Sequence, residues 1–420
     1  MKTEKKFYEM NLQERLSFIA SKTNLTRNEI STIVNQALPF EKIDRMIENA
    51  IGIFSLPLGI ATNFVINGKD YLIPMAIEEP SVIAAASHAA KLSRFFGGFR
   101  ASADSSIMRG QIQITDLLDI KNSIYIISKN KEALLSIANS RSKNVKALDL
   151  KTRVIKNDIT NQKMLLAELY VDCKDSMGAN SINSMCELLG PEIERRTSGK
   201  VILKILSNYS TERIAVSQAT FKKEEIGGHL VVDRILSAFG FAFSDPHRAV
   251  THNKGIMNGI DAVSIATGQD FRAIEAAAHA YASRDGKYRT ITSFSKSSNG
   301  DLIGKIEIPL SVGIVGGISS VHPVAKIGLE ILGVKSAGEL ACVIASVGLA
   351  QNFAAILALS TEGIQKGHMK LHAKNIAVAA GATGKLVDIV SETMYKQSNI
   401  GLDNARTILH KLQNRKHGST

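Results

Sequence analysis

The amino-acid sequence predicts an α+β fold with a large, mainly helical domain around a buried central helix, a small inserted α+β unit and a helical C-terminal part. Three observations predict this fold. Capped helical patterns occupy residues 11–50, strand-like and helical runs alternate over 108–216, and residues 340–360 form a long apolar stretch without a charge. A chain of 420 residues exceeds what one hydrophobic core usually organises, so two or three domains are expected.

Capping and turn residues predict the first helices and the first β-strands of the chain. Within 11–50, Thr26 and Glu29 stand at the spacing of a capping box ahead of an apolar-periodic run, which predicts the start of a helix. Two β-rich runs in 62–74 are joined by Asn67 and Gly68, the pair that a type I′ turn favours because both positions need positive φ. A β-hairpin is therefore predicted at this point.

The hairpin leads into an alanine-rich helical pattern. Pro80 suits the first turn of this helix, because its missing N–H would have no partner there. The pattern continues for about three turns of good helix formers. Glu79 is therefore expected at a helix entrance.

The segment 108–216 predicts a compact inserted unit. Strand-like runs begin at 110, 163 and 200. Helical runs cover 130–140 and 174–199, and the second of these is expected to stop at Gly199. Beyond this unit, helical and glycine-punctuated segments return, and the last fifty or so residues predict amphipathic helix before a polar basic tail.

The uncharged stretch 340–360 is long enough to cross a bilayer. It also contains Gln351, Asn352, two serines and a glycine. Small and polar residues at this density suit a helix that protein surrounds on every side. A buried central helix is the preferred interpretation, and a membrane span is the alternative.

Charge and composition narrow the class of partner. The formal net charge of +12 favours an anionic partner, which leaves nucleic acid, a lipid surface or a phosphate-bearing small molecule. Aromatic residues make up only 5%, tryptophan is absent and no long basic run occurs, which argues against nucleic acid. Three cysteines without CxxC spacing argue against a disulfide framework and fit a reducing cytoplasm. No apolar segment follows the charged start, so no secretory signal is expected, and no membrane partner is expected.

Neither GxGxxG nor GxxxxGK[ST] occurs, so a standard Rossmann or P-loop nucleotide site is not expected. The stretch DSMGAN at 175–180 lies between a predicted strand and a predicted helix, where free backbone N–H groups and the helix dipole attract phosphate. A tight turn without a ligand explains it equally well. The glycines of GIVGGISS, from Gly313, permit close approach of a ligand to the backbone, or a simple bend.

Four side chains are candidates for chemistry. Lys254, in THNKGIMNG, reads as a lysine on a turn of small residues, where its ammonium would stabilise a developing oxyanion or simply be solvated. Asp270 would orient Lys254 or serve as a helix N-cap. Glu79 is a candidate general acid, although a helix N-terminus by itself opposes protonation. His368 would deliver a proton or be structural, and its spacing to His372 without a glutamate or further ligands predicts no metal site.

With these residues in place, the sequence resembles the class II 3-hydroxy-3-methylglutaryl-CoA (HMG-CoA) reductases over nearly its whole length. The resemblance is carried by several motifs in the family's order: ENAIGIFSLPLGIA (48–61), MAIEEPSVIAAAS (75–87), DSMGAN (175–180), THNKGIMNGIDAV (251–263), ATGQD (266–270), GIVGG (313–317) and GLAQNFAAILALSTEGIQKGHMKLHAKNIA (348–377). It implies reduction of HMG-CoA to mevalonate and CoA, or the reverse, by two hydride transfers with NADH or NADPH and without a metal. Mevaldyl-CoA and mevaldehyde would be the intermediates of this mevalonate-pathway reaction.

The resemblance also implies roles for individual residues. Lys254 would stabilise the oxyanion, Glu79 would give or relay protons, Asp270 would tune both, and His368 would protonate the departing CoA thiolate. Family substrate contacts fall on Ser81, Arg248, Thr251 and Asn258, with Arg248 pairing with the free carboxylate of the substrate. Cofactor contacts fall on Asp149, Asp175, Met177, Gly178, Asn180, Gly316 and Gly317.

Cofactor preference stays open at this point. Asp149 matches the acidic residue that would bind the ribose 2′-hydroxyl of NADH. Lys143 and Lys146 lie nearby and would instead favour a 2′-phosphate. The family's GxGxxG-free cofactor site agrees with the missing signature, and the phosphates of CoA and a dinucleotide would explain the positive charge.

The domain organisation that the resemblance implies is a large domain in two parts (1–107 and 217–366), a small ferredoxin-like dinucleotide-binding domain (108–216) and a C-terminal flap (367–420). A homodimer is expected, with ENAIG (48–52) near the interface and the active site shared between subunits. The flap would close over the site and bring His368 in. The competing hypothesis is a non-catalytic basic dimer that binds CoA or nucleic acid.

Overall fold

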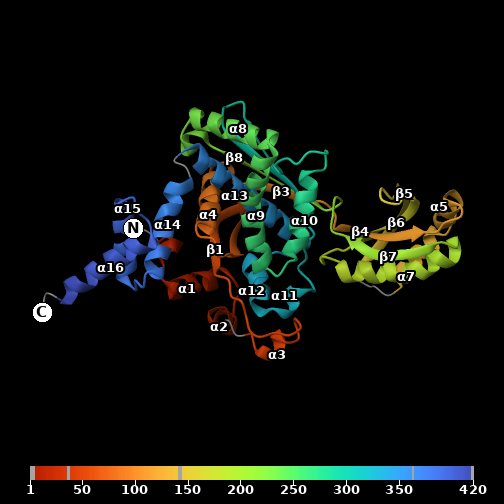
Figure 1. Ribbon diagram of the computed structural model, residues 1–420, viewed down its shortest axis with the longest axis horizontal. Helices are drawn as coiled ribbons and strands as arrows, with labels where there is room; N and C mark the ends of the chain where they lie inside the picture. Colours follow the sequence, from red (N-terminus) through yellow and green to blue (C-terminus); the bar gives the residue numbers. More distant parts are fainter. Residues whose placement is uncertain (1–4, 36–37, 141–143, 362–363, 418–420) are drawn as a thin grey trace.

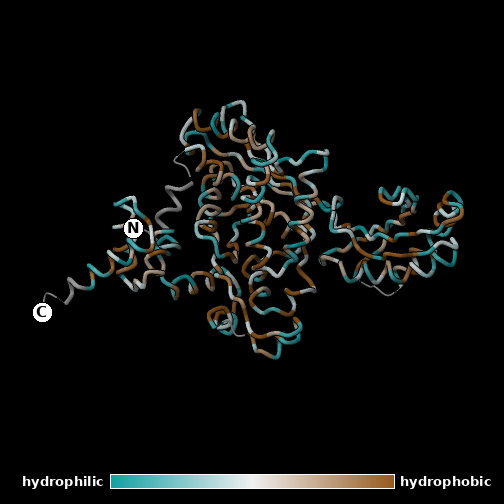
Figure 2. The backbone as a smooth tube through the Cα atoms, viewed as in Figure 1, coloured by the Kyte–Doolittle hydropathy of each residue, from teal (hydrophilic) through white to brown (hydrophobic). Residues whose placement is uncertain are grey.

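The structure is a computed structural model that describes residues 5–35, 38–140, 144–361 and 364–417, with side chains described except at 364–371 and 414–417. A large central unit carries a small sheet-containing unit on one side and the C-terminal helices on the opposite side (Figure 1). Each of these three parts has a hydrophobic cluster of its own. Figure 2 shows hydrophobic residues concentrated inside the central unit and hydrophilic residues over the outer loops.

The central unit contains a mixed sheet with the strand order β2-β1-β3-β8-β10-β9. Its strands are β1 (Leu58–Ile66), β2 (Lys69–Ala76), β3 (Phe99–Ala103), β8 (Ile214–Phe221), β9 (Thr292–Lys296) and β10 (Leu302–Pro309). β1 and β2 form the predicted hairpin, and Asn67 and Gly68 adopt φ values of 52° and 80°. The type I′ turn prediction is confirmed, because both positions have the positive φ that this turn needs.

Helices cover this sheet and contribute the rest of the core. They are α1 (Leu12–Lys22), α2 (Arg27–Asn35), α3 (Phe40–Ile43), α4 (Val82–Ser93), α8 (His229–Ser244), α9 (Pro246–Ala266), α10 (Phe271–Ala282), α11 (Ile318–Val321), α12 (Pro323–Leu332) and α13 (Ala337–Ser360), with 3₁₀ turns η1 (Phe7–Glu9), η2 (Arg94–Phe96) and η3 (Lys223–Ile226). The capping box at α2 is confirmed: the Glu29 carboxylate accepts from the Thr26 N–H at 2.7 Å, and the Glu29 N–H donates to the Thr26 hydroxyl at 3.3 Å.

α13 is the central helix of the large unit. It has the length and apolar composition of a membrane span, but 83% of its most apolar window is buried inside the protein. The predicted buried central helix is therefore confirmed. Ser346 illustrates how the polar residues are accommodated, because its hydroxyl lies 2.9 Å from that of Ser217 and donates to the Cys342 carbonyl at 2.7 Å.

Two glycines set the distance between α9 and α13. A Cβ atom on Gly259 would lie 2.9 Å from the Cβ of Gln351, and one on Gly348 would lie 2.9 Å from the Cδ1 of Ile260. Contacts this short do not occur between real side chains, so the crossing requires glycine at both positions. The close packing fixes the buried side of α9 and leaves its other side to carry polar groups.

The inserted unit consists of β4 (Ile107–Thr115), α5 (Ile120–Lys129), α6 (Lys131–Asn139), β5 (Lys146–Lys156), β6 (Lys163–Asp172), α7 (Ala179–Thr197) and β7 (Lys200–Ser207). Its antiparallel strands have the order β5-β6-β4-β7. A βαββαβ chain with this order is the ferredoxin-like arrangement. The predicted α+β character of this segment is confirmed.

The C-terminal part consists of α14 (Ile364–Ala379), α15 (Lys385–Lys396) and α16 (Leu402–His417). The predicted amphipathic helix is thus broken into separate helices, which pack around Ala377, Val390 and Leu409. One local prediction is wrong. Pro80 lies in the turn before α4 and not in its first helical turn, because the helix begins only at Val82 after Ser81.

Candidate active site

Helix α9 carries four of the predicted site residues. Asp245 caps its N-terminus by accepting from the Arg248 N–H at 2.8 Å, and Pro246 occupies the first helical position. The prediction that Lys254 lies on a turn is wrong, because Lys254 is in the middle of this helix. The glycines that read as turn residues include Gly259, whose missing side chain allows the contact with α13.

The spacing of these residues places them on one side of α9. Arg248, Thr251, Lys254 and Asn258 follow one another at intervals of three, three and four positions, which is the repeat of one helix face. Most of the residues between them are buried, among them Ala249, His252, Asn253, Ile256 and Met257, whereas Val250 is 50% exposed. The helix therefore presents the candidate residues away from the core.

Glu79 and Lys254 are in direct contact. The Lys254 ammonium donates to Glu79 Oε2 at 2.9 Å, and the Asn258 amide donates to the same oxygen at 3.3 Å. Glu79 comes from the turn between β2 and α4, so the structure joins two segments that the sequence could place only separately. An acid and a cation side by side can supply a proton and stabilise a negative charge at one reacting carbonyl.

Ser81 is held in an unusual backbone conformation beside Glu79. Its φ is +76° and its ψ is −18°, a left-handed conformation that is uncommon for a residue other than glycine. Its hydroxyl is buried and has no hydrogen-bond partner within the described part of the chain. Strained residues with an unpaired polar group are typical of ligand sites.

Asp270 takes the N-cap role that the sequence offered as an alternative. Its carboxylate accepts from the Ala273 N–H at 3.1 Å at the start of α10, and it lies 3.2 Å from the Arg272 guanidinium. No hydrogen bond or ion pair between Asp270 and Lys254 or Glu79 is found among the residues described. The structure therefore brings together Glu79, Lys254 and Asn258 but leaves Asp270 apart.

The remaining α9 candidates are free to meet a ligand. Among the described residues, the Thr251 hydroxyl bonds only to the His247 carbonyl of the preceding turn, at 3.3 Å. Arg248 is half-buried, and within the described ranges its guanidinium has no ion-pair partner. A guanidinium of this kind suits a carboxylate, which it can bind through two parallel hydrogen bonds.

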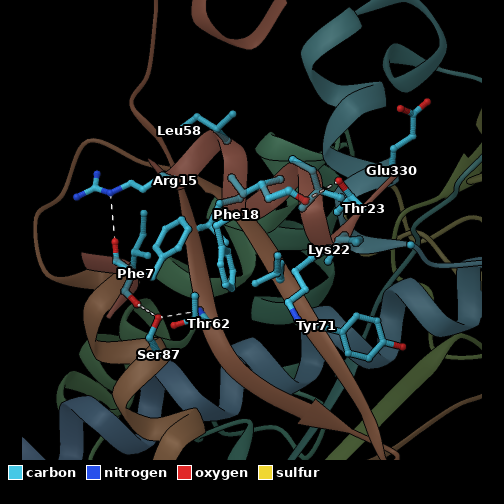
Figure 3. A pocket seen from close by; sticks show the side chains of 18 of the residues that line it. Phe7, Arg15, Phe18, Lys22, Thr23, Leu58, Thr62, Tyr71, Ser87 and Glu330 are labelled. Atoms are coloured by element: carbon cyan, nitrogen blue, oxygen red, sulfur yellow. Dashed lines mark hydrogen bonds between the residues drawn. The ribbon is translucent and has the colours of Figure 1, made fainter. Parts of the chain in front are cut away.

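A cavity of about 2300 Å³ opens beside Glu79 and Ser81. It extends between the N-terminal segment and the β1–β2 hairpin, where Phe7, Phe18 and Tyr71 point into the space (Figure 3). Many of its polar lining residues are basic, including Arg15, Lys22, Lys69, Lys91, Arg94 and Lys326. The cavity is large enough for a long ligand and carries the charge that attracts phosphate groups.

The DSMGAN segment follows β6 and leads into the first turn of α7, at the predicted junction of a strand and a helix. Gly178 is the N-cap of α7 and has a φ of +96°, and a Cβ atom there would lie 2.2 Å from the Cys173 sulfur. Glycine is therefore required at this position. Met177 is half-buried beside it, and Asn180 is exposed in the first turn of α7, where backbone N–H groups are available to an anion.

Arg213 supports this segment and was not found by sequence reasoning. Its buried guanidinium donates to the carbonyls of Ser176 and Met177, at 3.2 and 3.3 Å, and also to that of Val312. Burial lowers the pKa of Arg213 from its usual value. No motif marks this arginine in the sequence, because its partners lie far from it along the chain.

The DSMGAN segment also contacts the second glycine-rich segment. The Asp175 carboxylate accepts from the Ala337 N–H at 2.8 Å, and its backbone carbonyl accepts from the Ile314 N–H at 2.8 Å. Gly316 and Gly317 follow with φ values of +75° and +63°, and both are exposed. Ile314 and Gly316 line the large cavity, so these segments lie at its edge.

Asp149 lies on β5 in the inserted unit. Its carboxylate contacts the Lys131 ammonium, lies 3.8 Å from that of Lys151, and accepts from the Leu150 N–H at 2.8 Å. Hydrogen bonding to Lys131 is the main reason why the pKa of Asp149 is lowered. The predicted neighbour Lys143 and the side chain of His368 lie outside the described residues. No group of histidine, cysteine and carboxylate side chains suited to a metal ion occurs in the part that is described.

These site features can be compared with those of known proteins. The family model for hydroxymethylglutaryl-coenzyme A reductase matches residues 11–373, which include both Glu79 and Lys254. The chain belongs to the hydroxymethylglutaryl-coenzyme A reductase family. The curated 3-hydroxy-3-methylglutaryl-coenzyme A reductase of Archaeoglobus fulgidus is 52% identical over 412 residues, which cover 97% of this chain and 94% of that protein.

Solved structures of the hydroxymethylglutaryl-coenzyme A reductase family share the fold. The reductase of Streptococcus pneumoniae superimposes with a TM-score of 0.81 at 36% identity, covering 97% of this chain and 99% of that one. A class II reductase structure from the same organism, bound to NADPH in open conformations, gives a TM-score of 0.80 at 37% identity, with 96% and 100% covered. The predicted family and α+β fold are thereby confirmed.

Proposed function

We propose that this protein catalyses the NAD(P)H-dependent reduction of HMG-CoA to mevalonate and CoA, or the reverse reaction, through mevaldyl-CoA and mevaldehyde. The contact between Glu79 and Lys254 beside a large basic cavity, in a chain of this family, is the observation that carries the proposal. A thioester carbonyl that accepts a hydride develops negative charge on its oxygen. The Lys254 ammonium stabilises that charge, and Glu79 supplies or relays the proton.

The substrate contacts follow from the same geometry. The Arg248 guanidinium, which has no ion-pair partner in the part of the chain that the structure describes, binds the free carboxylate of the acyl group, with Thr251 on the same helix face. The buried Ser81 hydroxyl, which has no partner within the described chain, gains one when the substrate is bound. Asn258 holds Glu79 in place, and the basic residues of the cavity attract the phosphates of CoA.

Two further roles are part of the proposal. Asp270 acts electrostatically on Lys254 from the N-terminus of α10, where its carboxylate lies 3.2 Å from the Arg272 guanidinium. His368, on α14, protonates the departing thiolate when the C-terminal flap (367–420) closes over the large domain (1–107 and 217–366). The separate hydrophobic cluster of α14 to α16 supports movement of the flap as one body.

The residues of the inserted unit (108–216) fit a nicotinamide dinucleotide. The observations are the glycine requirement at Gly178, the exposed N-terminus of α7 and the support of the loop by Arg213. Met177, Asn180, Gly316 and Gly317 would hold the cofactor at the cavity edge, while Asp175 fixes the loop. The bound cofactor supplies the hydride.

Asp149 bears on the choice between NADH and NADPH. Its carboxylate would accept a hydrogen bond from the ribose 2′-hydroxyl of NADH. Lys131 and Lys151, which already contact it, would instead pair with the 2′-phosphate of NADPH after a small side-chain rotation. We propose that both cofactors are accepted at this site.

We also propose that the protein is a cytoplasmic homodimer. The segment that contains ENAIG (48–52) exposes Ile51 and Phe54 with 99% and 91% of their surfaces accessible. Large apolar side chains exposed in one short segment are typical of a protein interface. A second copy of the chain is the partner that the family resemblance implies for this segment.

One experiment tests the catalytic proposal. Purified protein is incubated with HMG-CoA and either NADH or NADPH, and the loss of reduced nicotinamide is followed together with the release of CoA thiol. Two equivalents of reduced cofactor consumed per CoA released, with mevalonate as the product, are expected. Folded protein that oxidises neither cofactor with HMG-CoA, and reduces neither with mevalonate and CoA, would refute the proposal.

A further inference from the structure

Arg213 lies where the chain passes back from the inserted unit into the sheet of the central unit. It directly precedes β8, and the other passage, residues 104–106 between β3 and β4, lies beside it. The Asp104 N–H donates to the Ile214 carbonyl at 2.8 Å, and the Arg213 carbonyl accepts from the Leu310 N–H, just after β10, at 3.0 Å. The backbone of Arg213 is therefore fixed to the central unit.

The side chain of Arg213 reaches across the boundary between the two units. Both terminal nitrogens of its guanidinium donate to the Ser176 carbonyl, each at 3.2 Å, and one also donates to the Met177 carbonyl at 3.3 Å. These carbonyls belong to the inserted unit, whereas the third acceptor, the Val312 carbonyl, belongs to the central unit. One planar group thus joins the backbones of both units. The junction comprises residues 175–177, 213 and 312–313.

Gly313 packs directly on the backbone of the DSMGAN segment at this junction. A Cβ atom on Gly313 would lie 2.7 Å from the Met177 nitrogen and 2.9 Å from the Ser176 carbonyl carbon, so the two backbones touch with no side chain between them. The Gly313 N–H donates to Gln269 Oε1 at 2.9 Å, and Gln269 directly precedes Asp270. The junction therefore extends from the proposed cofactor loop to the neighbour of a proposed catalytic residue.

Stability alone does not explain an arginine at this point. Arg213 is 4% exposed, and no carboxylate among the described residues forms an ion pair with it. A buried cation without an anionic partner costs free energy. Arginine does offer a rigid planar fork of donors, which the single ammonium of lysine does not. This fork suits three carbonyls that two different units supply.

We propose that Arg213 is a positioning residue for the nicotinamide cofactor. It locks the DSMGAN segment of the inserted unit to residues 312–317 of the central unit, so that the cofactor contacts on the two sides of the junction form one site. The proposal rests on the cofactor site proposed above. The proposed substrate residues on α9 belong to the central unit alone, so the lock acts on binding of the cofactor and not on binding of HMG-CoA.

The first test measures the junction without cofactor or substrate. Backbone hydrogen–deuterium exchange is compared between the wild type and Arg213→Lys, with Arg195→Lys as the control, because Arg195 is exposed on α7 of the same inserted unit. Lysine keeps the charge but cannot bind all three carbonyls at once. Peptides covering 175–178 and 312–316 should exchange about tenfold faster in Arg213→Lys, with β10 unchanged. Arg195→Lys should exchange as the wild type does.

The second test measures binding and turnover. Titration with NADPH, followed by the fluorescence of the reduced nicotinamide, should give a Kd about tenfold higher for Arg213→Lys than for the wild type. The KM for HMG-CoA should change less than about twofold, because the substrate residues lie on one side of the junction. A variant that had only lost stability would contain less active protein, and both constants would stay as in the wild type.

Gly313→Ala tests the same junction without a change at Arg213. The new Cβ would push the DSMGAN segment away from residues 312–313, and Gly313 is not among the glycines with positive φ, so alanine adds no backbone strain. The Kd for NADPH should again rise about tenfold. The control is Gly338→Ala in the first turn of α13, where the nearest atoms would lie 3.9 Å from the new Cβ. This control should keep the wild-type Kd.

Each outcome decides a different point. Unchanged exchange of 175–178 and 312–316 in Arg213→Lys would overturn the lock between the units. An unchanged Kd for NADPH in Gly313→Ala, or an equal rise in the KM for HMG-CoA, would overturn the positioning role even if Arg213→Lys does not fold. Should the wild type bind neither NADPH nor NADH, the proposed cofactor site fails and the positioning role with it, whereas the exchange comparison still shows whether Arg213 joins the two units.

Discussion

The Lys254 ammonium lies 2.9 Å from the Glu79 carboxylate, although 175 positions separate the two residues in the chain. The side chains are 61% and 34% exposed, respectively. An ion pair with this exposure contributes only about 0–1 kcal/mol to stability. Stability does not explain this contact. In the proposed function it places a proton donor and a cation together next to the cavity that Ser81 lines.

Replacing Lys254 with methionine should lower kcat for HMG-CoA reduction by about 10²- to 10³-fold, because one donor to the developing oxyanion is lost. Methionine has a similar length, and the position is half-exposed, so the fold should be unaffected. Steady-state oxidation of NADPH measures the effect. Lys121→Met, at an exposed position on α5, is the control and should leave kcat unchanged. Comparable activity in both variants would remove Lys254 from the mechanism.

Gly178→Ala should destabilise the protein and weaken the cofactor site. The new Cβ would overlap the Cys173 sulfur at 2.2 Å and would add strain at a φ of +96°. We expect a loss of about 1–3 kcal/mol in the free energy of unfolding and a raised KM for NADPH, with the KM for HMG-CoA unchanged.

Gly97→Ala separates the steric overlap from the backbone strain. Gly97 has a similar conformation, with φ 85° and ψ 15°, but there is open space where its Cβ would be. It should lose only about 1–2 kcal/mol and keep the wild-type KM for NADPH. Urea unfolding and initial rates measure both variants. If both variants lost the same free energy of unfolding, the overlap with Cys173 would be relieved by a shift of neighbouring atoms that costs no stability.

Local features of the fold could be predicted from the sequence because their causes lie within a few residues. The turn at Asn67 and Gly68 and the capping box of Thr26 and Glu29 each need only neighbours in the chain. Family motifs supplied the residue types of the candidate site, including Glu79 and Lys254. What they could not supply was the distance between these two groups, which depends on how α9 packs.

The wrong prediction at Lys254 and the missed residue Arg213 both result from contacts between segments that are far apart in the sequence. Glycines near Lys254 suggested a turn, yet Gly259 serves the close contact with Gln351 on α13, and the helix continues through it. Arg213 was missed for a related reason, because it binds the carbonyls of Met177 and Val312 at sequence separations of 36 and 99 residues. No pattern in the sequence reports contacts at that range.

Phe54→Asp should weaken self-association of the protein. Phe54 is 91% exposed in the single chain, and a charge in the centre of an apolar interface would remain desolvated and unpaired. We expect the dissociation constant of the dimer to rise about thirtyfold or more. Sedimentation equilibrium measures it, with Leu118→Asp as the control, because Leu118 is also fully exposed but lies on the inserted unit. A dimer that persists in Phe54→Asp would place the interface elsewhere.

His252 should make the protein sensitive to acid. It is buried between α9 and β9, where its Nε2 lies 2.7 Å from the Thr292 hydroxyl, which in turn donates to Asn352 at 2.8 Å. Burial is the main cause that lowers the pKa of His252 to about 3. Below pH 6.5 the unfolded chain gains a proton that the native state does not, so stability falls as the pH falls toward 3, by about 1.4 kcal/mol per pH unit.

His252→Gln should reduce this dependence, because glutamine can still donate to Thr292 but does not titrate. Between pH 6.5 and 4.5 the free energy of unfolding of the wild type should fall by roughly 2–3 kcal/mol more than that of the variant. Urea unfolding at several pH values measures the difference between the two slopes. His229→Gln, at an exposed position at the start of α8, should keep the wild-type slope. Parallel slopes for His252→Gln and the wild type would show that His252 becomes protonated in the native state without loss of its contacts.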